Sequence, residues 1–447
     1  MTDAQQTIAA VAPRVARGEL RSETLTEQAL ARIADLQPTL NAFITVTAEE
    51  ALASARRADQ EIAGGRYLGQ LHGIPISLKD LLDMKGVSTT AASRLRAEHV
   101  ARRDAPVTAK LRAAGAVIVG KTNLHEFAFG TTSEDSGWGP CRHPLDPSRS
   151  PGGSSGGSAA GVRAGMTFAT VGTDTGGSIR IPAAACGIVG LKPGWNEISA
   201  DGVVPLSRQL DHVGPLARSV EDVSTMFDIM RGSAPTVIEA APLFGRKFGL
   251  LGGYFLDRLD EHVEAALLSA VDVLRRAGAS ITEVTIPHAG DIAPIYLHLV
   301  LADAAAYHAR SLEERPAAYT PNVRIRLEMG RHVLAEDYVR ALNGRRVIAR
   351  EVDAALEGMD ALLLPALSIP APPLGQATVP VKGGQEVVRT AMLRCTQPFN
   401  VSSHPALSLP CGNTPAGLPV GLQMVGRLGF TSDLLRVSRS VEAALSA

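Results

Sequence analysis

Two glycine- and serine-rich loops hold the residues of this chain that could attack a carbonyl group. Residues 151–158 read Pro-Gly-Gly-Ser-Ser-Gly-Gly-Ser, and residues 172–180 read Gly-Thr-Asp-Thr-Gly-Gly-Ser-Ile-Arg. Glycine lets backbone N–H groups approach a reacting atom closely, and a serine hydroxyl can attack a carbonyl or pass on a proton. Upstream, the apolar residues 74–78 lead into Lys79. These residues predict a serine hydrolase that works without histidine.

Lys79 could serve as the base of such a hydrolase only with its amine neutral. The unperturbed pKa of a lysine is about 10.4, and burial lowers it because the ammonium form loses its hydration. Residues 74–78 read as a short buried strand, which would carry the amine into the interior. The sequence therefore predicts a lysine with a lowered pKa.

Two short patterns point to other chemistry but lack the required context. Residues 115–122 fit the phosphate loop G-x-x-x-x-G-K-[ST], yet the residues between the glycines, Ala-Val-Ile-Val, read as the strand itself. Residues 152–156 fit the nucleophile elbow G-x-S-x-G, which needs a strand leading into it and a late histidine as base. Three prolines precede this motif, and the candidate base His404 adjoins a proline and reads as a turn residue. ATP binding and an α/β-hydrolase are therefore disfavoured.

The glycine loops and the lysine segment resemble the defining motifs of the amidase signature family. The matching segments run in order through most of the chain: residues 73–80, 151–158, 172–180, 187–193, 210–218, 404–410 and 417–423. The resemblance implies a Ser–cis-Ser–Lys triad. In it Ser178 would be the nucleophile, Ser154 the bridging serine after a non-proline cis peptide bond, and Lys79 the base.

The same resemblance implies an oxyanion hole and supporting residues around the nucleophile. The oxyanion hole would be made by backbone N–H groups of Thr175, Gly176, Gly177 and Ser178. A glycine-rich turn that opens a helix at Ser178 would aim these donors at one point. Asp174 and Arg180 flank the nucleophile, and we expect them to pair with each other as scaffold. Ser155, beside the bridging serine, is a further supporting residue.

The substrate is less visible than the reaction. Members of the family include general and aryl acylamidases, carbamate- and urea-cleaving enzymes, and the glutaminase A subunit of tRNA-dependent amidotransferases. Residues 195–197, Trp-Asn-Glu, stand near where many members have a Gly-Arg pair. Asp135 stands where asparagine is frequent, and residues 429–433 lack the usual Asp-Glu pair. These departures favour a stand-alone hydrolase.

We therefore predict hydrolysis of an aryl or apolar acyl amide to a carboxylate and an amine. Three residues are expected to line the acyl side of the pocket: Phe129, Gly130 and Thr131. The alternatives that remain are cleavage of a carbamate (a urethanase activity) or of a urea, a non-catalytic binding protein, and the glutaminase subunit of an amidotransferase.

Composition narrows the class of partner. The chain has 447 residues, 45% of them hydrophobic, and a formal net charge of −1, so a nucleic-acid partner is disfavoured. Four widely spaced cysteines and the histidine spacings indicate neither a disulfide framework nor a metal site, and no cofactor is predicted. No signal peptide and no uninterrupted apolar run of membrane-spanning length are visible. We expect a soluble, cytoplasmic enzyme acting on small molecules; whether it forms a homodimer is left open.

Helix and strand patterns alternate along the chain, as in an α/β layered domain. Helices are expected over residues 25–36, 48–62, 107–112, 261–277 and 433–444, and strands over 74–78, 116–119, 167–171, 188–191, 247–251, 360–365, 405–410 and 418–425. The capping-box spacing of Thr24 and Glu27 marks the expected start of the first helix.

No linker or repeat divides the chain, so we predict one large domain, residues 1–447. Its expected parts are an N-terminal helical segment (1–65), the signature core (66–235), a variable helix-rich region by the substrate entrance (243–350) and a C-terminal return to the sheet (355–447). The resemblance implies a central mixed, twisted sheet with helices on both faces.

Overall fold

The computed structural model describes residues 6–446 and has one large sheet at its centre. The strands are β1 Phe43–Val46, β2 Pro75–Lys79, β3 Val117–Thr122, β4 Ala169–Asp174, β5 Val189–Lys192, β6 His212–Ala217, β7 Lys247–Leu251, β8 Ser280–Val284, β9 Ala361–Pro365, β10 Thr378–Val381, β11 Gly384–Val387, β12 Ala406–Asn413 and β13 Pro419–Val425. Eleven form the sheet β1-β3-β2-β4-β6-β5-β12-β13-β9-β7-β8, and β10 and β11 form a hairpin apart from it. The sheet is mixed, since β2 pairs in parallel with β3 and β4 whereas β12 pairs antiparallel with β5 and β13.

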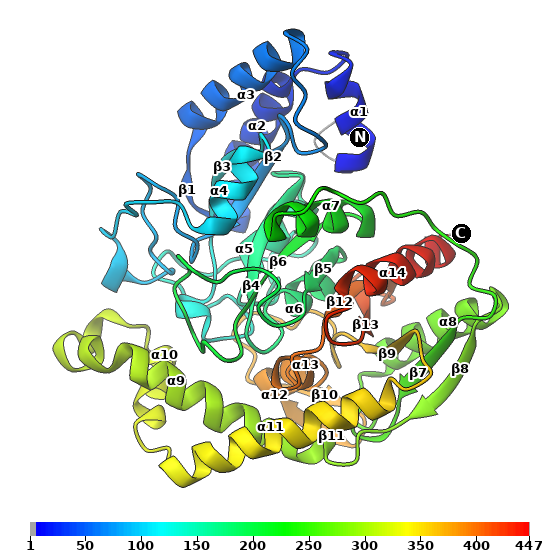
Figure 1. The fold of residues 1–447 in the computed structure, drawn as a ribbon. Helices are drawn as coiled ribbons and strands as arrows, with labels where there is room; N and C mark the ends of the chain where they lie inside the picture. Colours follow the sequence, from blue (N-terminus) through cyan, green and yellow to red (C-terminus); the bar gives the residue numbers. More distant parts are fainter. Residues whose placement is uncertain (1–5, 447) are drawn as a thin grey trace.

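Helices cover both faces of this sheet (Figure 1). They are α1 Ile8–Ala16, α2 Ser22–Leu40, α3 Ala48–Ala63, α4 Pro106–Ala113, α5 Gly156–Arg163, α6 Arg180–Cys186, α7 Val220–Arg231, α8 Glu261–Arg276, α9 Ile292–Glu314, α10 Pro321–Gly330, α11 Ala335–Ala355, α12 Val388–Leu393, α13 Pro398–Val401 and α14 Thr431–Ser446. α7, α8 and α14 pack on one face of the central strands, and α5 and α6 pack on the other. This arrangement confirms the predicted fold class.

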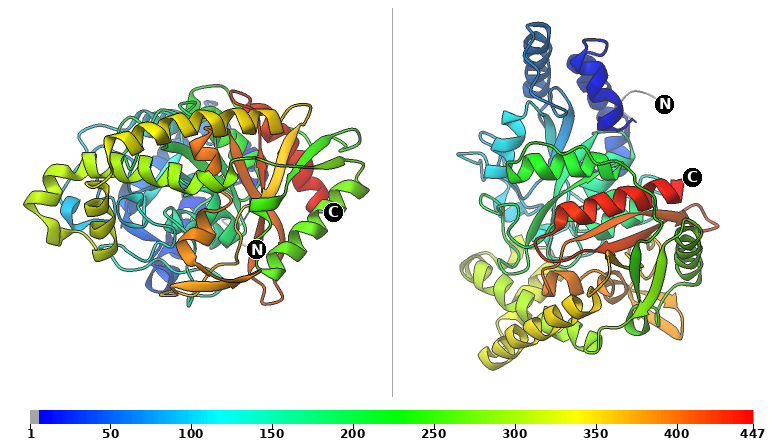
Figure 2. Two further views of the ribbon diagram at one scale, coloured as in Figure 1. Left: turned by 90° about the horizontal axis from the view of Figure 1, so that it is seen from below. Right: turned by 45° about the vertical axis from the view of Figure 1, so that its right-hand side comes forward.

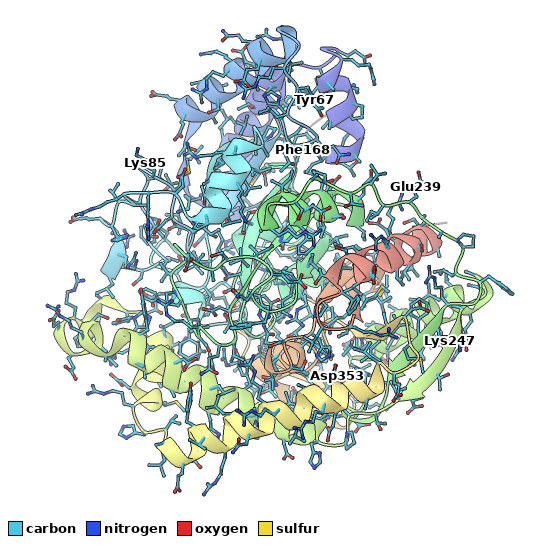
Figure 3. The ribbon with its side chains drawn as sticks, in the orientation of Figure 1. Tyr67, Lys85, Phe168, Glu239, Lys247 and Asp353 are labelled. Carbon is cyan, nitrogen blue, oxygen red and sulfur yellow. The ribbon has the colours of Figure 1, made fainter. Side chains whose placement is uncertain are left out.

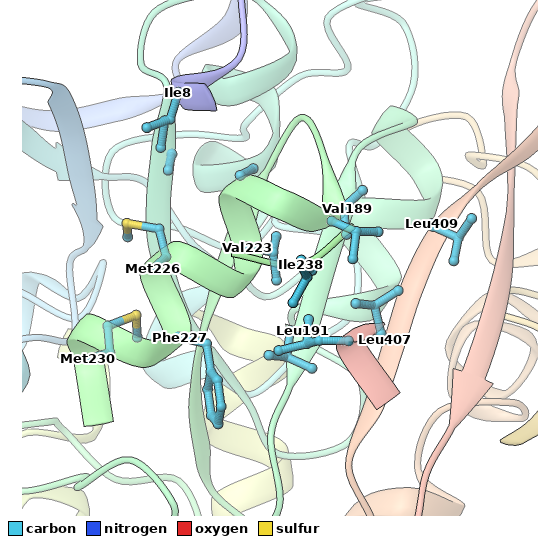
Figure 4. Close-up of a cluster of buried hydrophobic side chains, with 14 of the residues drawn as sticks. Ile8, Val189, Leu191, Val223, Met226, Phe227, Met230, Ile238, Leu407 and Leu409 are labelled. Carbon is cyan, nitrogen blue, oxygen red and sulfur yellow. The ribbon is translucent and has the colours of Figure 1, made fainter. Parts of the chain in front are cut away.

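The main core lies between α7 and the middle of the sheet (Figure 4). Leu407 and Leu409 of β12 lie in this core together with Leu191 of β5 and Phe227 of α7. Because side chains alternate along a strand, Ser408 projects to the opposite face, toward α6. The fully buried sheet centre thus holds a short helix and its glycine loop rigidly on one side.

The molecule is elongated across the sheet, with α2 and α3 at one end and α9, α10 and α11 at the other (Figures 1 and 2). Side chains fill the space between these layers (Figure 3). Phe168, for example, is fully buried, whereas Lys85 and Glu239 lie on the outside. The segment 243–350, expected to be helix-rich, contributes α8 to α11 and also two strands, β7 and β8, at one sheet edge.

Two helices begin at other residues than the sequence predicts. α2 begins at Ser22 and not at the Thr24 capping box, because the carboxylate of Asp59 on α3 accepts hydrogen bonds from the backbone N–H groups of Ser22 (2.7 Å) and Glu23 (3.1 Å). A tertiary contact therefore replaces the local cap. α6 begins at Arg180 and not at Ser178, so the nucleophile candidate lies in the loop before the helix.

One segment in the described part of the chain, Ala289–Glu314, is long and apolar enough to cross a membrane by length and composition. Half of the most apolar 18-residue stretch of this segment is buried inside the protein. There α9 packs against α10, α11 and α13. The apolar residues of this helix are thus part of the second core cluster.

Candidate active site

Lys79 ends the fully buried strand β2, and its side chain is fully buried. β2 lies between β3 and β4, which puts Lys79 close to Thr173 near the end of β4. Lys79 Nζ is 2.8 Å from Thr173 Oγ1 and 2.7 Å from Ser154 Oγ. The sheet therefore brings the predicted base to the predicted bridging serine, and Thr173 is a second contact that the sequence analysis missed.

Burial lowers the pKa of Lys79 to about 7, although Asp174 and Asp211 act in the opposite direction. The amine is therefore neutral in a large fraction of molecules near pH 7. A neutral amine can accept a proton from a hydroxyl, as the predicted chemistry requires. The expected lowering of the lysine pKa is confirmed.

Ser154 follows a cis peptide bond, Gly153–Ser154, and is fully buried. Its carbonyl oxygen accepts hydrogen bonds from His125 N (3.1 Å) and Ser133 Oγ (3.2 Å). Gly153 lies against the same segment, and a Cβ there would come within 2.8 Å of Ser133 N. Only glycine fits this close approach, so the Ser154 backbone is fixed by residues 125–133.

Ser178 lies in the loop between β4 and α6 and is 6% exposed. Its carbonyl oxygen accepts a hydrogen bond from Ser155 N at 3.2 Å, which joins the two glycine loops. The Ser155 hydroxyl donates to Thr173 O at 3.2 Å. The structure thus brings Ser178 beside the Lys79–Ser154 pair, but no hydrogen bond joins the Ser154 and Ser178 hydroxyls in the described chain.

The residues predicted for the oxyanion hole have free backbone donors. Within residues 6–446, the N–H groups of Thr175, Gly176, Gly177 and Ser178 donate to no protein acceptor. The Thr175 hydroxyl donates to Asp211 Oδ1 at 2.6 Å, and Gly176 O accepts from Thr396 Oγ1 at 2.7 Å. Burial raises the pKa of Asp211 to about 6. Unpaired N–H groups in a fixed loop are what an oxyanion site requires.

Asp174 and Arg180 form a buried ion pair behind this loop, as expected. Arg180 Nη2 lies 2.8 Å from Asp174 Oδ1, and both side chains are fully buried. The guanidinium also donates to Gln423 Oε1 and Asn400 Oδ1, each at 2.7 Å, and to Thr396 O at 2.8 Å. Burial alone would raise the pKa of Asp174, but Arg180 holds it well below its usual range. The pair therefore stays charged and fixes the loop.

The three predicted pocket residues lie along the segment that supports Ser154. Thr131 is buried and its carbonyl carbon faces Gly153, whereas Gly130 lies against the His125 ring. Phe129 is buried, and Arg326 Nη1 donates to its carbonyl oxygen at 2.6 Å. Thr131 thus lies against the residue that precedes Ser154, and the contact of all three residues with substrate remains a prediction.

A cavity of about 160 Å³ opens on the other side of the glycine loop. Thr173, Thr175 and Asp211 line it together with residues 199–206. Thr173 and Asp211 stand inside motifs that the sequence analysis quoted, but their spacing carried no signal of a contact. Their role depends on pairings between segments far apart in the chain.

Known proteins resemble this chain over nearly its whole length. Residues 24–435 match the Amidase family. An amidase of Pseudomonas putida is 39% identical, covering 98% of this chain and 96% of its own. The A subunit of glutamyl-tRNA(Gln) amidotransferase from Chloroflexus aurantiacus is 38% identical, covering 96% and 95%. A crystal structure of an amidase superposes with a TM-score of 0.93 at 37% identity, covering 98% and 99%. The chain belongs to the amidase family of hydrolases.

Proposed function

We propose that this protein hydrolyses a linear carboxylic amide to a carboxylate and an amine through an acyl-enzyme on Ser178. The observation that carries the proposal is the fully buried Lys79, with a pKa near 7, placed 2.7 Å from Ser154 Oγ. A serine hydroxyl becomes a useful nucleophile only when a nearby base takes its proton. Lys79 is that base, acting through Ser154.

The reaction begins with attack of Ser178 Oγ on the carbonyl carbon. As the new C–O bond forms, the Ser178 proton moves to Ser154 Oγ, and the Ser154 proton moves to neutral Lys79. The negative oxygen of the tetrahedral intermediate is bound by the free N–H groups of residues 175–178. When the C–N bond breaks, Lys79 returns its proton through Ser154 to the leaving nitrogen. Water then repeats the sequence and releases the carboxylate.

The acyl group is aryl or apolar in this proposal. Phe129 and Thr131 support it because both are buried and Thr131 lies against Gly153. Carbamates and ureas present a similar carbonyl to Lys79, Ser154 and Ser178, so the substrates tested below include aryl carbamates to detect a urethanase activity.

The test is amide hydrolysis by single variants of the three side chains. Ser178→Ala, Ser154→Ala and Lys79→Ala are each expected to lower kcat/KM by about 10³-fold or more, because the three groups act as a unit. Substrates are p-nitroanilides, aliphatic amides, aryl carbamates and glutamine. Ser148→Ala is the matched control, since this exposed serine lies just before the first glycine loop and its hydroxyl pairs only with Asp146 in the described chain. Near-wild-type activity in all three variants would refute the mechanism.

Labelling by a fluorophosphonate separates the enzyme from a binding protein of the same fold. Wild type is expected to become labelled on Ser178, and Ser178→Ala is expected to stay unlabelled. A wild-type chain that neither reacts with the probe nor hydrolyses any member of the panel, alone or with any co-purifying chain, is a binding protein.

A glutaminase subunit is the second candidate, favoured by the 38% identity to an amidotransferase A subunit. That role predicts ammonia release from glutamine only in the presence of partner chains. Purification of a tagged chain from its own cells, followed by assay with and without any co-purifying chain, separates the two functions.

A further inference from the structure

Two arginine side chains meet on Phe129, close to the loop that carries Ser178. The Cζ atoms of Arg326 on α10 and Arg389 on α12 each lie 5.9 Å from the centroid of the Phe129 ring. Burial lowers the pKa of Arg326 to about 10, and the charge of Arg389 acts in the same direction. The two cations therefore repel each other, which costs stability unless an anion lies near both.

The charge of Arg389 is not compensated within the protein. Among residues 6–446, Arg389 makes no hydrogen bond and no ion pair, although its side chain is partly buried. Arg326 donates to Phe129 O, and the carboxylate whose charge acts on it, Asp135, is engaged by His125 and Asn322. Burial lowers the pKa of His125, so this ring adds no positive charge near pH 7. Two guanidinium groups thus share no free protein anion.

The arginines reach the candidate oxyanion loop through two neighbours. A Cβ on Gly176 would lie 2.5 Å from the Tyr296 hydroxyl oxygen and 3.1 Å from Leu393 Cδ2. Leu393 and Arg389 are four residues apart on α12, so both face the same side of that helix. Tyr296 lies within the electrostatic reach of both arginines, and its hydroxyl has no hydrogen-bond partner in the described chain.

We propose that Arg389 and Arg326, with the Tyr296 hydroxyl, bind a carboxylate at the far end of the substrate's acyl group. The substrate class is then a monoamide of a dicarboxylic acid, with an apolar stem between the scissile carbonyl and the acid. Guanidinium groups bind carboxylates with two parallel, charge-assisted hydrogen bonds, and a phenol adds a third donor. This inference rests on the proposed function and replaces its wholly apolar acyl group by one with an apolar stem and a terminal carboxylate.

The test compares acidic and neutral amides of matched length. Succinamate is paired with butyramide, glutaramate with valeramide, and adipamate with hexanamide, so that each pair differs only by the terminal carboxylate. Wild type is expected to favour the acid in at least one pair by about tenfold or more in kcat/KM, because its cations would otherwise stay unpaired. Arg389→Gln is expected to lower this ratio about tenfold, and Arg389→Lys is expected to restore part of it.

Arg394→Gln is the matched control. Arg394 directly follows α12, and its change to glutamine removes one positive charge, as Arg389→Gln does. Arg394 Cζ lies 4.0 Å from the centroid of the Tyr254 ring, and its side chain donates a hydrogen bond to Tyr254 O. This variant is expected to keep the wild-type ratio. Thermal unfolding of each variant shows whether the fold is retained.

The outcomes for the subsite and for the hydrolase are distinguishable. If amides are cleaved in a Ser178-dependent manner but acids and neutral partners react alike, the subsite is refuted and the hydrolase stands. If no amide is cleaved, calorimetric binding of succinate, glutarate and adipate decides the subsite separately. Binding of at least one diacid that weakens about tenfold in Arg389→Gln supports it, and absent or unaltered binding refutes it.

Discussion

In the proposed mechanism, a single buried amine sets the pH range in which the site can work. Since burial lowers the pKa of Lys79 to about 7, its amine is protonated and inactive below that pH and neutral above it. We predict that kcat/KM rises with an apparent pKa near 7 and then stays level. A pH profile measured with a substrate that does not itself titrate tests this, and a rise only near the pKa of an ordinary lysine would contradict it.

Changing Asp211 identifies the group responsible for that rise. The negative charge of Asp211 raises the pKa of Lys79, so Asp211→Asn is expected to move the rising limb toward lower pH. If the rise of kcat/KM stays at the same pH in Asp211→Asn, a group other than Lys79 is responsible for it. Asp211 also accepts from Thr175, so a lower plateau is expected together with the shift.

Thr173 is expected to position the lysine amine. Thr173→Val removes the hydroxyl 2.8 Å from Lys79 Nζ with little change in volume, and we expect kcat to fall about tenfold because the amine loses its fixed place. Thr173→Ser keeps the hydroxyl and is expected to restore most of the activity. Equal activity of the valine and serine variants would show that this contact is unnecessary.

At the scale of single elements, the start of α2 depends on a neighbouring helix. Asp59→Ala removes the acceptor of two backbone N–H groups, at Ser22 and Glu23, and is expected to lower the free energy of unfolding by about 1 kcal/mol. Thr24→Ala removes the hydroxyl of the local pattern and is expected to change it by less than about 0.5 kcal/mol. Denaturant unfolding of both variants measures the difference. A larger loss of stability in Thr24→Ala than in Asp59→Ala would show that the local capping box, and not Asp59, stabilises the start of α2.

Local patterns predict those elements whose own residues carry the signal. The strand that delivers Lys79 and the amphipathic helix α8 lie where the sequence places them, and the strand predicted at 116–119 is β3, which runs on to Thr122. Because β3 runs through the second glycine of the phosphate-loop pattern, the residues between the two glycines form strand and not an open loop. The hairpin of β10 and β11 was missed because its residues are largely exposed and lack a hydrophobic alternation long enough to stand out.

The candidate site likewise contains some residues that a local motif predicts and others that no local motif predicts. The resemblance pointed to Lys79, Ser154 and Ser178, since each lies in a contiguous motif. Arg389, Tyr296 and their approach to Gly176 could not be foreseen because no local pattern links α9, α12 and the glycine loop. Only the packing of the whole chain brings them together.

At the scale of the whole molecule, Arg180 joins the glycine loop to the C-terminal part of the chain. Its partners Thr396, Asn400 and Gln423 lie more than 200 residues away in sequence. Arg180→Ala leaves Asp174 buried without its counter-charge, so the free energy of unfolding is expected to fall by about 3–5 kcal/mol. Arg340→Ala, which breaks an exposed ion pair, is the control and is expected to move the unfolding midpoint little. Equal midpoints for the two variants would contradict this.

The strand order has a consequence for biosynthesis. β12 and β13 stand between β5 and β9, so two strands that are made after all the other described strands unite the two halves of the sheet. A nascent chain leaving the ribosome therefore shows two unsatisfied edges until residues 406–425 have emerged. The loop bearing Ser178 also depends on the C-terminal segment, because Arg180, which fixes this loop, donates hydrogen bonds to Asn400 and Gln423. In the proposed mechanism, the site is thus incomplete until residues 396–423 have been made.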